Sequence, residues 1–394
     1  MSSRKLGIAV VGIGGAVGTT MVAGIELIKK GSVSTDGLPL AAVSAAKLID
    51  YRDIVFAGWD LFPDHLARAA EQHEVLTHNQ FVSVENELRS IKPWPAISDN
   101  RFLSNIDGGN RLHESTHRGS IAGVRSNLAA FRKTFDAVVV INLASTEKLA
   151  AEGNESFNSI ADFERALDEN SPDISPAMLY AYAAIAEGLP YGNFTPSLAA
   201  DVPALIEFAE KQKVAIAGKD GKTGQTFIKT VLAPALKSRA LKVEGWYSTN
   251  ILGNRDGLAL SNEDSLASKI KTKSSVLEDI LGYDVADHIV DIRYYRPRGD
   301  NKEAWDNIDI SGFLGQPMQL KVNFLCKDSI LAAPLAIEIA RCLDLAQRRG
   351  ETGIQEQLSV FFKLPMSKNN RPEHAFHRQE EILLQWLRSD PINR

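Results

Sequence analysis

Cysteine is scarce in this sequence: only Cys326 and Cys342 occur among its 394 residues. Two cysteines are too few for the disulfide framework of a small secreted domain, and the clustered Cys and His spacings of a zinc site are missing. Runs of five or six like charges are also absent, and 44 basic against 49 acidic side chains leave a formal net charge of −5. This balance argues against nucleic acids and anionic membranes as partners. We therefore expect a protein of the reducing cytoplasm.

The sequence also lacks a convincing membrane span or signal peptide. The uncharged stretch at residues 6–25 has a suitable length, but it contains six glycines and two threonines. This composition fits a buried strand, a glycine turn and a helix instead. With 44% hydrophobic residues the chain can build a large core, and its length predicts two domains at about 100–200 residues per domain.

Apolar runs separated by helical patterns predict a doubly wound α/β domain in the first half. Residues 5–11 predict a strand, and residues 16–30 predict a helix. Continuous apolar runs at 53–57 and 135–142 predict two further strands of a parallel sheet that is covered on both faces. After a polar, helix-bearing connector, residues 213–217 predict another strand, followed by a loop and a helix that ends near residue 238.

The pattern changes near residue 230, where a second, more sheet-like domain is expected to begin. Its predicted strands are the β-rich runs at 242–247, 288–295 and 318–325. Helical patterns then return at 331–346 and 378–387, and they predict segments that pack back on the first domain. The sequence thus predicts three parts, at residues 1–229, 230–331 and 332–394.

A glycine-rich loop lies between the first predicted strand and helix, at residues 12–18 (GIGGAVG). Glycine allows a sharp turn and a close approach to a pyrophosphate, whose charge is favoured by helix N-terminal amides. The spacing differs from the usual G-x-G-x-x-G, and the acidic residue after the second strand, Asp60, comes later than the usual ~20 residues. We therefore interpret residues 31–50 as an insertion. We expect dinucleotide binding here, with a purely structural turn as the alternative.

Two further motifs suggest metal or phosphate sites. Residues 113–117 (HESTH) match the H-E-x-x-H pattern of zinc proteases, but flanking glycines and the lack of an amphipathic pattern favour a surface loop without metal. Residues 221–223 (GKT) resemble the end of a P-loop, yet the required earlier glycine is Ile216. Gly218, Gly221 and Gly224 could still form an anion cradle, and a tight structural turn is equally consistent with them.

Three lysines, Lys269, Lys271 and Lys273, precede an apolar run at residues 276–281. If this region is helical, Lys269 and Lys273 share one face at i and i+4. Two such ammonium groups can hold a phosphate, or polarise a carbonyl and move protons if burial lowers a pKa. Most lysines of this kind belong to a solvated face, which is the simpler interpretation.

Taken together, a series of short motifs across most of the chain resembles the myo-inositol-phosphate synthase family. Many motifs in the family's order are far more specific than any one of them. The segments that carry the resemblance are residues 12–20, 58–60 (GWD), 142–147 (NLASTE), 188–196 (GLPYGNFTP), 218–226 (GKDGKTGQT), 252–257 (LGNRDG), 268–275 (SKIKTKSS), 299–302 (GDNK), 328–334 (DSILAAP) and 362–365 (FKLP).

The resemblance implies an architecture and a reaction. It implies an NAD-binding Rossmann domain over residues 1–229, a catalytic and oligomerisation α+β domain over 230–331, a C-terminal segment over 332–394 that returns to the Rossmann domain, and a homotetramer. The implied reaction turns D-glucose 6-phosphate into 1D-myo-inositol 3-phosphate. In it NAD oxidises C5, the C6 enolate attacks the C1 aldehyde, and retained NADH reduces the product. Cations placed at the developing oxyanions lower such barriers.

Site residues follow from the resemblance, position by position. Lys269 and Lys363 would serve the C5 oxygen, and Lys273 and Lys302 the phosphate and the C1 oxygen. The implied catalytic residues are Lys269, Lys273, Lys302, Lys363, Asp220 and Asp256, and the implied substrate ligands are Thr223, Gly224, Asn250, Asp300 and Asp328. The implied cofactor ligands are Gly12, Gly14, Gly15, Ala16, Val17, Gly18, Asp60, Ala144, Thr146, Asn193, Asp220, Asp256 and Asp328.

Some positions depart from the family pattern. Ala16 and Val17 stand where many members have asparagines, and Arg255 stands where asparagine is usual. Lys327 and Phe227 replace a glutamate and a lysine, and Thr223 replaces a serine. Arg255 keeps open a paralogous NAD-dependent cyclase or dehydrogenase that acts on another sugar phosphate. An NAD-binding protein without catalysis is a further alternative, against which the complete set of lysines argues.

Overall fold

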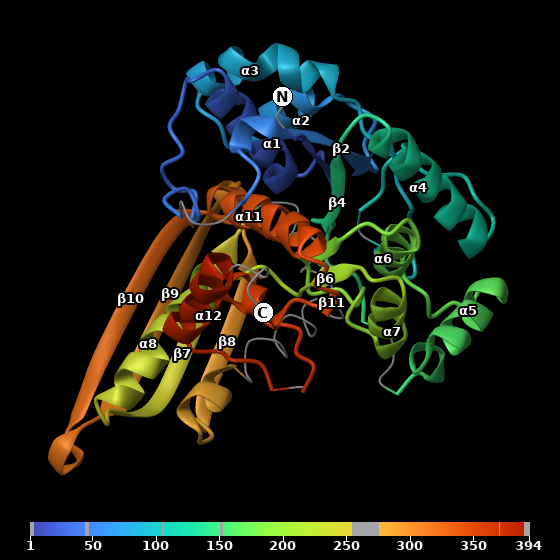
Figure 1. The fold of residues 1–394 in the computed structure, drawn as a ribbon. Coiled ribbons are helices and arrows are strands. Elements are labelled where there is room, and N and C mark those ends of the chain that lie inside the picture. Colours follow the sequence, from blue (N-terminus) through green and yellow to red (C-terminus); the bar gives the residue numbers. More distant parts are fainter. Residues whose placement is uncertain are drawn as a thin grey trace.

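The chain forms two β-sheets with helices packed around them (Figure 1). The computed structural model describes residues 4–43, 47–104, 106–149, 153–253, 276–369 and 371–389. The larger sheet has the strand order β11-β6-β5-β4-β1-β2-β3. Its strands are β1 (Leu6–Val11), β2 (Ile54–Asp60), β3 (Trp94–Pro95), β4 (Ala137–Asn142), β5 (Tyr191–Asn193), β6 (Ala215–Ala217) and β11 (Gly353–Ile354).

All pairs in the larger sheet are parallel, so the carboxyl ends of its strands share one edge. β1 lies in the middle and pairs with β2 on one side and β4 on the other. All six residues of β1 are buried, which explains why its sequence is a continuous apolar run. This arrangement brings the glycine loop after β1, Asp60 at the end of β2 and Asn142 at the end of β4 to the same edge.

Helices cover both faces of the larger sheet, which confirms the predicted doubly wound α/β class. One apolar core contains buried residues of α1 and α3, and the other contains buried residues of α4 to α7. None of the helices in the described ranges is long and apolar enough to cross a membrane. The helices are α1 (Ala16–Lys29), α2 (Leu66–His73), α3 (His78–Ser90), α4 (His117–Arg132), α5 (Ile160–Asp168), α6 (Pro176–Ala186) and α7 (Pro203–Lys211).

The second sheet has four strands in the order β10-β9-β7-β8. β7 (Lys242–Leu252) pairs in parallel with β8 (Asp287–Tyr294) and antiparallel with β9 (Asn301–Ser311), which forms a long hairpin with β10 (Pro317–Lys327). α8 (Gly224–Ser238) packs on this sheet through Ala233 and Leu236, which share an apolar cluster with Trp246 and Ile308. The predicted second, sheet-containing part of the fold is confirmed.

The chain then returns to the larger sheet, as the helical patterns predict. α11 (Asp328–Arg348) packs against α1 and the strands β4, β5 and β6. β11 extends the edge of that sheet beside β6, and α12 (Phe376–Arg388) packs against α8. α8 begins before residue 230 and packs on the second sheet. The three predicted domain boundaries themselves stay a prediction.

The buried carboxylate of Glu338 on α11 binds residues of the segment 31–53, which contains the expected insertion. Its Oε1 accepts a hydrogen bond from the Tyr51 hydroxyl at 2.6 Å and from the Leu40 amide at 3.2 Å. Its Oε2 pairs with Arg341 at 2.6 Å, and Arg341 also donates to the carbonyl of Ile49. Burial and the nearby Glu338 charge raise the pKa of Tyr51. The described parts of the insertion, residues 31–43 and 47–50, are thus held against the core through Leu40 and Ile49.

Candidate active site

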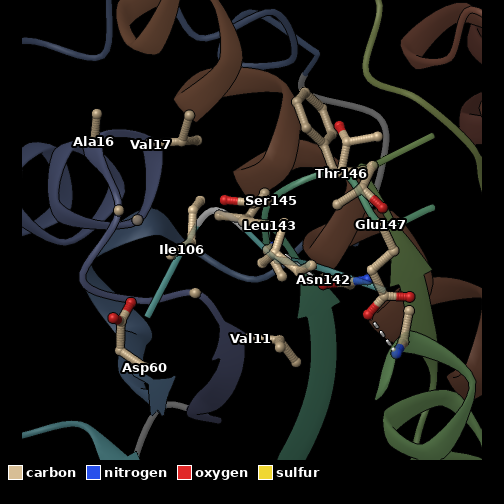
Figure 2. Close-up of a pocket in the computed structure, with 18 of the residues that line it drawn as sticks. Val11, Ala16, Val17, Asp60, Ile106, Asn142, Leu143, Ser145, Thr146 and Glu147 are labelled. Atoms are coloured by element: carbon tan, nitrogen blue, oxygen red, sulfur yellow. Dashed lines mark hydrogen bonds between the residues drawn. The ribbon is translucent and has the colours of Figure 1, made fainter. Parts of the chain in front are cut away.

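A large cavity opens at the carboxyl edge of the larger sheet and reaches across to the second sheet. One part of the wall is formed by the glycine loop, Asp60 and the chain after β4. Figure 2 shows Asp60, the first residues of α1 (Ala16 and Val17) and the segment after β4 around the pocket. The other side carries two lysines, from β9 and from the segment after β11. Among the sequence-predicted residues, the cavity is lined by Gly12, Gly15, Ala16, Val17, Gly18, Asp60, Ala144, Thr146, Asp220, Thr223, Lys302, Asp328 and Lys363.

The glycine loop has the close contacts that its composition predicts. Gly12 has a φ of +84°, which L side chains rarely adopt, and its amide donates to the Trp59 carbonyl at 2.8 Å. A Cβ on Gly18 would lie 2.4 Å from the Ile13 carbonyl oxygen, so only glycine lets α1 start this close to the loop. The first helical amide with an acceptor is that of Thr19, which bonds to Gly15. The amides of residues 16–18 are therefore available at the N-terminus of α1, where an anion is favoured.

Asp60 lies at the end of β2, beside the glycine loop, with only 8% of its surface exposed. Its Oδ2 accepts the Gly14 amide at 2.8 Å, and its Oδ1 accepts the Phe62 amide at 3.1 Å. A carboxylate at this point of a Rossmann sheet is placed to accept the ribose hydroxyls of a dinucleotide. Asp60 thus links the glycine loop to the end of β2 at the cavity wall.

The segment after β4 lines the middle of the cavity through Ala144 and Thr146. Asn142 is held at the end of the strand by Asn193, whose Oδ1 accepts from it at 3.3 Å and also accepts the Thr195 amide and hydroxyl. The side-chain amide of Asn193 donates to the Ser197 carbonyl. Asn193 therefore shapes the 193–197 turn, and its side chain does not line the cavity.

Two loops from distant parts of the chain pair with each other at the far side of the cavity. Residues 218–222 and 361–366 form antiparallel backbone hydrogen bonds, among them Lys363 N to Asp220 O at 2.7 Å and Lys219 N to Leu364 O at 2.8 Å. Across this pair the Lys363 ammonium contacts Asp220 Oδ1 at 2.6 Å, with 5% and 3% of the residues exposed. The second oxygen of Asp220 is buried without a hydrogen-bond partner. The ion pair is therefore shielded from water, and the backbone hydrogen bonds between the two loops fix its position at the cavity wall.

A second lysine and carboxylate line the cavity, Lys302 from β9 of the second sheet and Asp328 from the start of α11. Lys302 Nζ lies 3.2 Å from Oδ1 of Asp328, and only 6% of Lys302 is exposed. The Thr223 hydroxyl donates to the same oxygen at 3.2 Å. Gly224 packs beside the Lys302 stem, because a Cβ there would lie 3.5 Å from Lys302 Cε. The start of α8, the start of α11 and β9 therefore meet at one point of the cavity.

Two predicted substrate ligands lie near this point but do not line the cavity. The carboxylate of Asp300 accepts the Ser329 hydroxyl at 2.6 Å and the Ser329 amide at 3.2 Å, which fixes the first turn of α11. Asn250 is 1% exposed and donates to Gln225, while its Oδ1 has no partner. The remaining predicted residues Asp256, Lys269 and Lys273 lie outside the described residues, as do Lys271 and Arg255.

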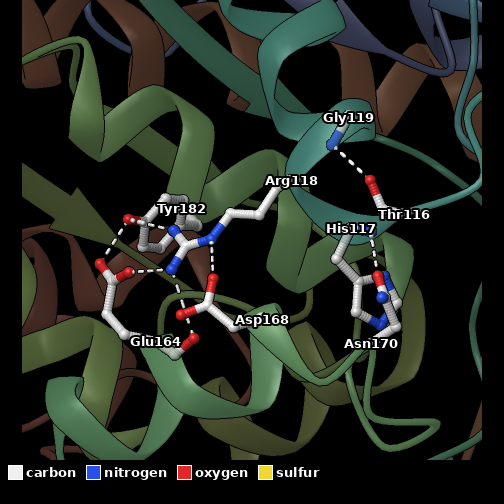
Figure 3. A network of polar contacts seen from close by, with 8 residues as sticks. All are labelled: Thr116, His117, Arg118, Gly119, Glu164, Asp168, Asn170 and Tyr182. Carbon is white, nitrogen blue, oxygen red and sulfur yellow. Dashed lines mark hydrogen bonds and ion pairs between the residues drawn. The ribbon is translucent and has the colours of Figure 1, made fainter.

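The HESTH motif is structural in the described chain. His113 and Glu114 are exposed in a loop, as expected, whereas His117 is the first residue of α4 and its Nε2 donates to the Ser171 carbonyl at 2.8 Å. Figure 3 shows the polar network that follows, in which Arg118 pairs with Asp168 and Glu164. No group of three or more His, Cys, Asp or Glu side chains among the described residues could hold a metal ion.

Glu147 and His73 also line the cavity, although the sequence analysis assigned neither of them a role. Glu147 lies on the opposite side of the view from Asp60 in Figure 2, and its Oε1 accepts the Ala177 amide at the start of α6 at 3.0 Å. Burial raises its pKa to about 7. His73 ends α2 and contacts the glycine loop. Glu147 lies in the 142–147 motif, but the resemblance assigned roles only to other residues of that motif, and His73 lies in no motif.

The glycine loop, Asp60 and the two lysine–aspartate pairs of one cavity define a dinucleotide-dependent enzyme of the Rossmann type. The family model for myo-inositol-1-phosphate synthase, an NAD-binding family, matches residues 38–388. The protein belongs to this family, which confirms the resemblance found from the sequence and NAD as its predicted cofactor.

Individual relatives agree with this assignment. The chain is 43% identical to inositol-3-phosphate synthase 1 of Bacteroides thetaiotaomicron, over 98% of this chain and 96% of the relative. It is 30% identical to inositol-3-phosphate synthase 1 of Oryza sativa subsp. japonica, over 87% of this chain and 75% of the relative. The solved structure of inositol-3-phosphate synthase from Caenorhabditis elegans superposes with a TM-score of 0.91 at 26% identity, covering 98% of this chain and 86% of that one. A myo-inositol-1-phosphate synthase-related protein from Thermotoga maritima gives a TM-score of 0.82 at 25% identity, covering 98% of each chain.

Proposed function

We propose that the protein converts D-glucose 6-phosphate into 1D-myo-inositol 3-phosphate with NAD and without net redox change. The observation that carries this proposal is the pair of desolvated lysine–aspartate contacts, Lys363–Asp220 and Lys302–Asp328, on the wall opposite a dinucleotide-binding loop. A simple dehydrogenase needs one acid–base group at one oxygen. Several cations around one cavity suit a reaction in which charge develops at more than one oxygen.

The proposed reaction balances within the substrate. The reaction starts from the open-chain sugar, in which C5 carries a hydroxyl and C1 is an aldehyde. NAD, when bound, would supply the hydride acceptor for C5 and, as NADH, the hydride donor for the same carbon at the end. In between, the C5 ketone acidifies C6, a proton leaves C6, the C6–C1 bond forms, and the aldehyde oxygen takes up a proton. The C5 hydroxyl loses its proton in the first step and regains one in the last. Product and substrate are therefore isomers.

Lys363 is assigned to the C5 oxygen. Its ammonium is held by Asp220 at 2.6 Å in a nearly dry wall, so that it is oriented before substrate binds. In that position Lys363 can take the hydroxyl proton as the neutral amine, and as the ammonium it can return a proton and stabilise the negative oxygen of the enolate. Lys269 has the same assignment from the family resemblance.

Lys302 and the start of α8 are assigned to the phosphate and the C1 oxygen. Thr223 and Gly224 lie at the N-terminus of α8, where backbone amides favour an anion, and Lys302 adds a positive charge beside them. Asp328 orients both Lys302 and the Thr223 hydroxyl. Lys273, Asp256, Asn250 and Asp300 complete the substrate site in this proposal.

The cofactor is assigned to the other wall of the cavity. Gly12, Gly15 and Gly18, with the amides of Ala16 and Val17, would face the pyrophosphate, and Asp60 would accept the ribose hydroxyls. Gly14 does not line the cavity, and its role would be to hold the loop through its contact to Asp60. Ala144 and Thr146 would surround the rest of NAD, with Asn193 shaping the turn behind them, and Asp220, Asp256 and Asp328 would lie at its nicotinamide end. The close contacts of Gly12 and Gly18 support this assignment, because they allow the tight turn that such a loop needs to bring its backbone near a pyrophosphate.

A substrate panel tests the proposal against its main alternative, a paralogue that acts on another sugar phosphate. Purified protein with NAD is incubated separately with glucose 6-phosphate and with other hexose and pentose phosphates, and the dephosphorylated products are separated by chromatography. We expect inositol from glucose 6-phosphate alone. Conversion of another sugar phosphate, with glucose 6-phosphate unchanged, would favour the paralogue and direct attention to Arg255.

The assembly, domain boundaries and location form part of the same proposal. We expect a homotetramer built largely on the second sheet, with the domains at residues 1–229, 230–331 and 332–394, in the cytoplasm. Light scattering at micromolar concentration tests the assembly, and a monomeric mass would contradict it.

A further inference from the structure

His73 makes a contact to the glycine loop that the proposed function does not use. It is the last residue of α2, and its Nε2 lies 2.9 Å from the carbonyl oxygen of Gly14. A carbonyl oxygen can only accept, so Nε2 carries the proton and donates. The imidazole also lines the same cavity as the glycine loop.

Gly14 is thereby held on both of its peptide groups. Its amide donates to Asp60 Oδ2 at 2.8 Å, while its carbonyl accepts from His73. The neighbouring Gly15 amide is bonded within the loop, to Gly12 at 3.0 Å. Two side chains from separate elements, β2 and α2, therefore fix a segment whose own glycines offer no side chain to hold it.

The fixed segment leads directly into the amides that face a pyrophosphate. Gly15 is the N-cap of α1, and the amides of residues 16–18 have no intrahelical acceptor. Glycine-rich backbone loses more conformational freedom on ordering than other sequences. If a ligand has to order such a loop when it binds, the entropy cost lowers the binding affinity. A hydrogen bond to Gly14 restricts the loop before the ligand binds.

We propose that His73 is a positioning residue for the cofactor: its Nε2–H holds the Gly14 carbonyl and so presents the α1 amides to the pyrophosphate. This inference rests on NAD binding at the glycine loop, as in the proposed function. It predicts that His73 contributes to affinity for ligands that contain the pyrophosphate, without contact to adenine and without a role in the chemical steps.

The test uses the full-length protein and calorimetric titration with ADP-ribose and with adenosine. We expect His73→Ala to weaken ADP-ribose binding by about tenfold, the size of one lost hydrogen bond near an anion, with adenosine binding unchanged. His73→Gln places an amide N–H near the position of Nε2 and is expected to retain affinity within about threefold. His78→Ala, at an exposed histidine that does not line the cavity, is the matched control.

Turnover gives a second readout. At saturating NAD, His73→Ala should reach the wild-type kcat, with the defect confined to the KM for NAD. Equal losses for adenosine and ADP-ribose, unchanged ADP-ribose affinity in His73→Ala, or failure of His73→Gln to restore it would each overturn the inference. A wild-type protein that bound neither NAD nor ADP-ribose would instead overturn the proposed cofactor site itself.

Discussion

Replacing Lys363 by methionine separates the catalytic from the structural role of the buried ion pair. The change removes the ammonium that lies 2.6 Å from Asp220 and leaves that carboxylate 3% exposed with neither oxygen bonded to a side-chain cation. Breaking one partner of a buried pair destabilises a protein by about 3–5 kcal/mol. Loss of a positioned acid–base group lowers the rate by about 10²–10⁴-fold. We expect Lys363→Met to show both effects, measured by denaturant unfolding and by inositol phosphate formation.

The double variant Lys363→Met/Asp220→Asn distinguishes the two effects. It removes both charges, so most of the lost stability should return while the activity stays as low as in Lys363→Met. Lys219→Met is the matched control. Lys219 lies next to Asp220 in the 218–222 loop and pairs with Asp201 at 2.6 Å, but it does not line the cavity. We expect it to lose stability and to keep kcat within about threefold. Full activity of Lys363→Met, or activity restored by Asp220→Asn, would refute the assignment of Lys363.

Three further predictions follow from the structure. Burial raises the pKa of Glu147 from 4.5 to about 7, so the folded state holds its proton longer than the unfolded state and stability falls as pH rises from 4.5 to 7. Glu147→Gln should remove this loss, so that above pH 7 its free energy of unfolding exceeds that of the wild type by about 3 kcal/mol. A stability difference between variant and wild type that did not change with pH would contradict this prediction. Asp60→Ala should weaken NAD binding at least about tenfold by calorimetry, because both the ribose acceptor and the Gly14 partner are lost, and unchanged affinity would exclude Asp60 from the site. Tyr51→Phe leaves the buried Glu338 short of one donor and should lower the free energy of unfolding by about 1–3 kcal/mol with kcat unchanged; a stability equal to wild type would mean that this contact does not hold the insertion.

The fold was predictable where burial is complete along a segment. β1 and β4 are continuous apolar runs, and α1 directly follows the glycine loop, so pattern alone identifies all three. β9 was not predicted, because its buried positions include the charged residues Lys302 and Asp306 as well as Ala304 and Ile308. A strand that buries charged side chains beside a functional cavity does not show an apolar alternation.

The candidate site was predictable only in part. The glycine loop has its own local pattern, whereas Lys363 and Asp220 are 143 positions apart and meet because two loops pair. Nothing in either loop predicts this pairing without the family resemblance. Glu147 lies in the segment after β4, in a motif that gave it no role, and His73 ends a helix that carries no motif. Long-range packing therefore decides which polar side chains surround the ligand, and composition and spacing do not report it.

Turnover with substoichiometric NAD tests the central claim most directly. Purified protein, glucose 6-phosphate in large excess and a small amount of NAD are incubated together, and the phosphorylated product is followed by phosphorus NMR. The account predicts inositol phosphate well in excess of the added NAD, with no lasting accumulation of NADH, because each hydride returns to the carbon it left. Product limited to the amount of NAD, with an equal amount of NADH formed, would contradict a redox-neutral cyclisation.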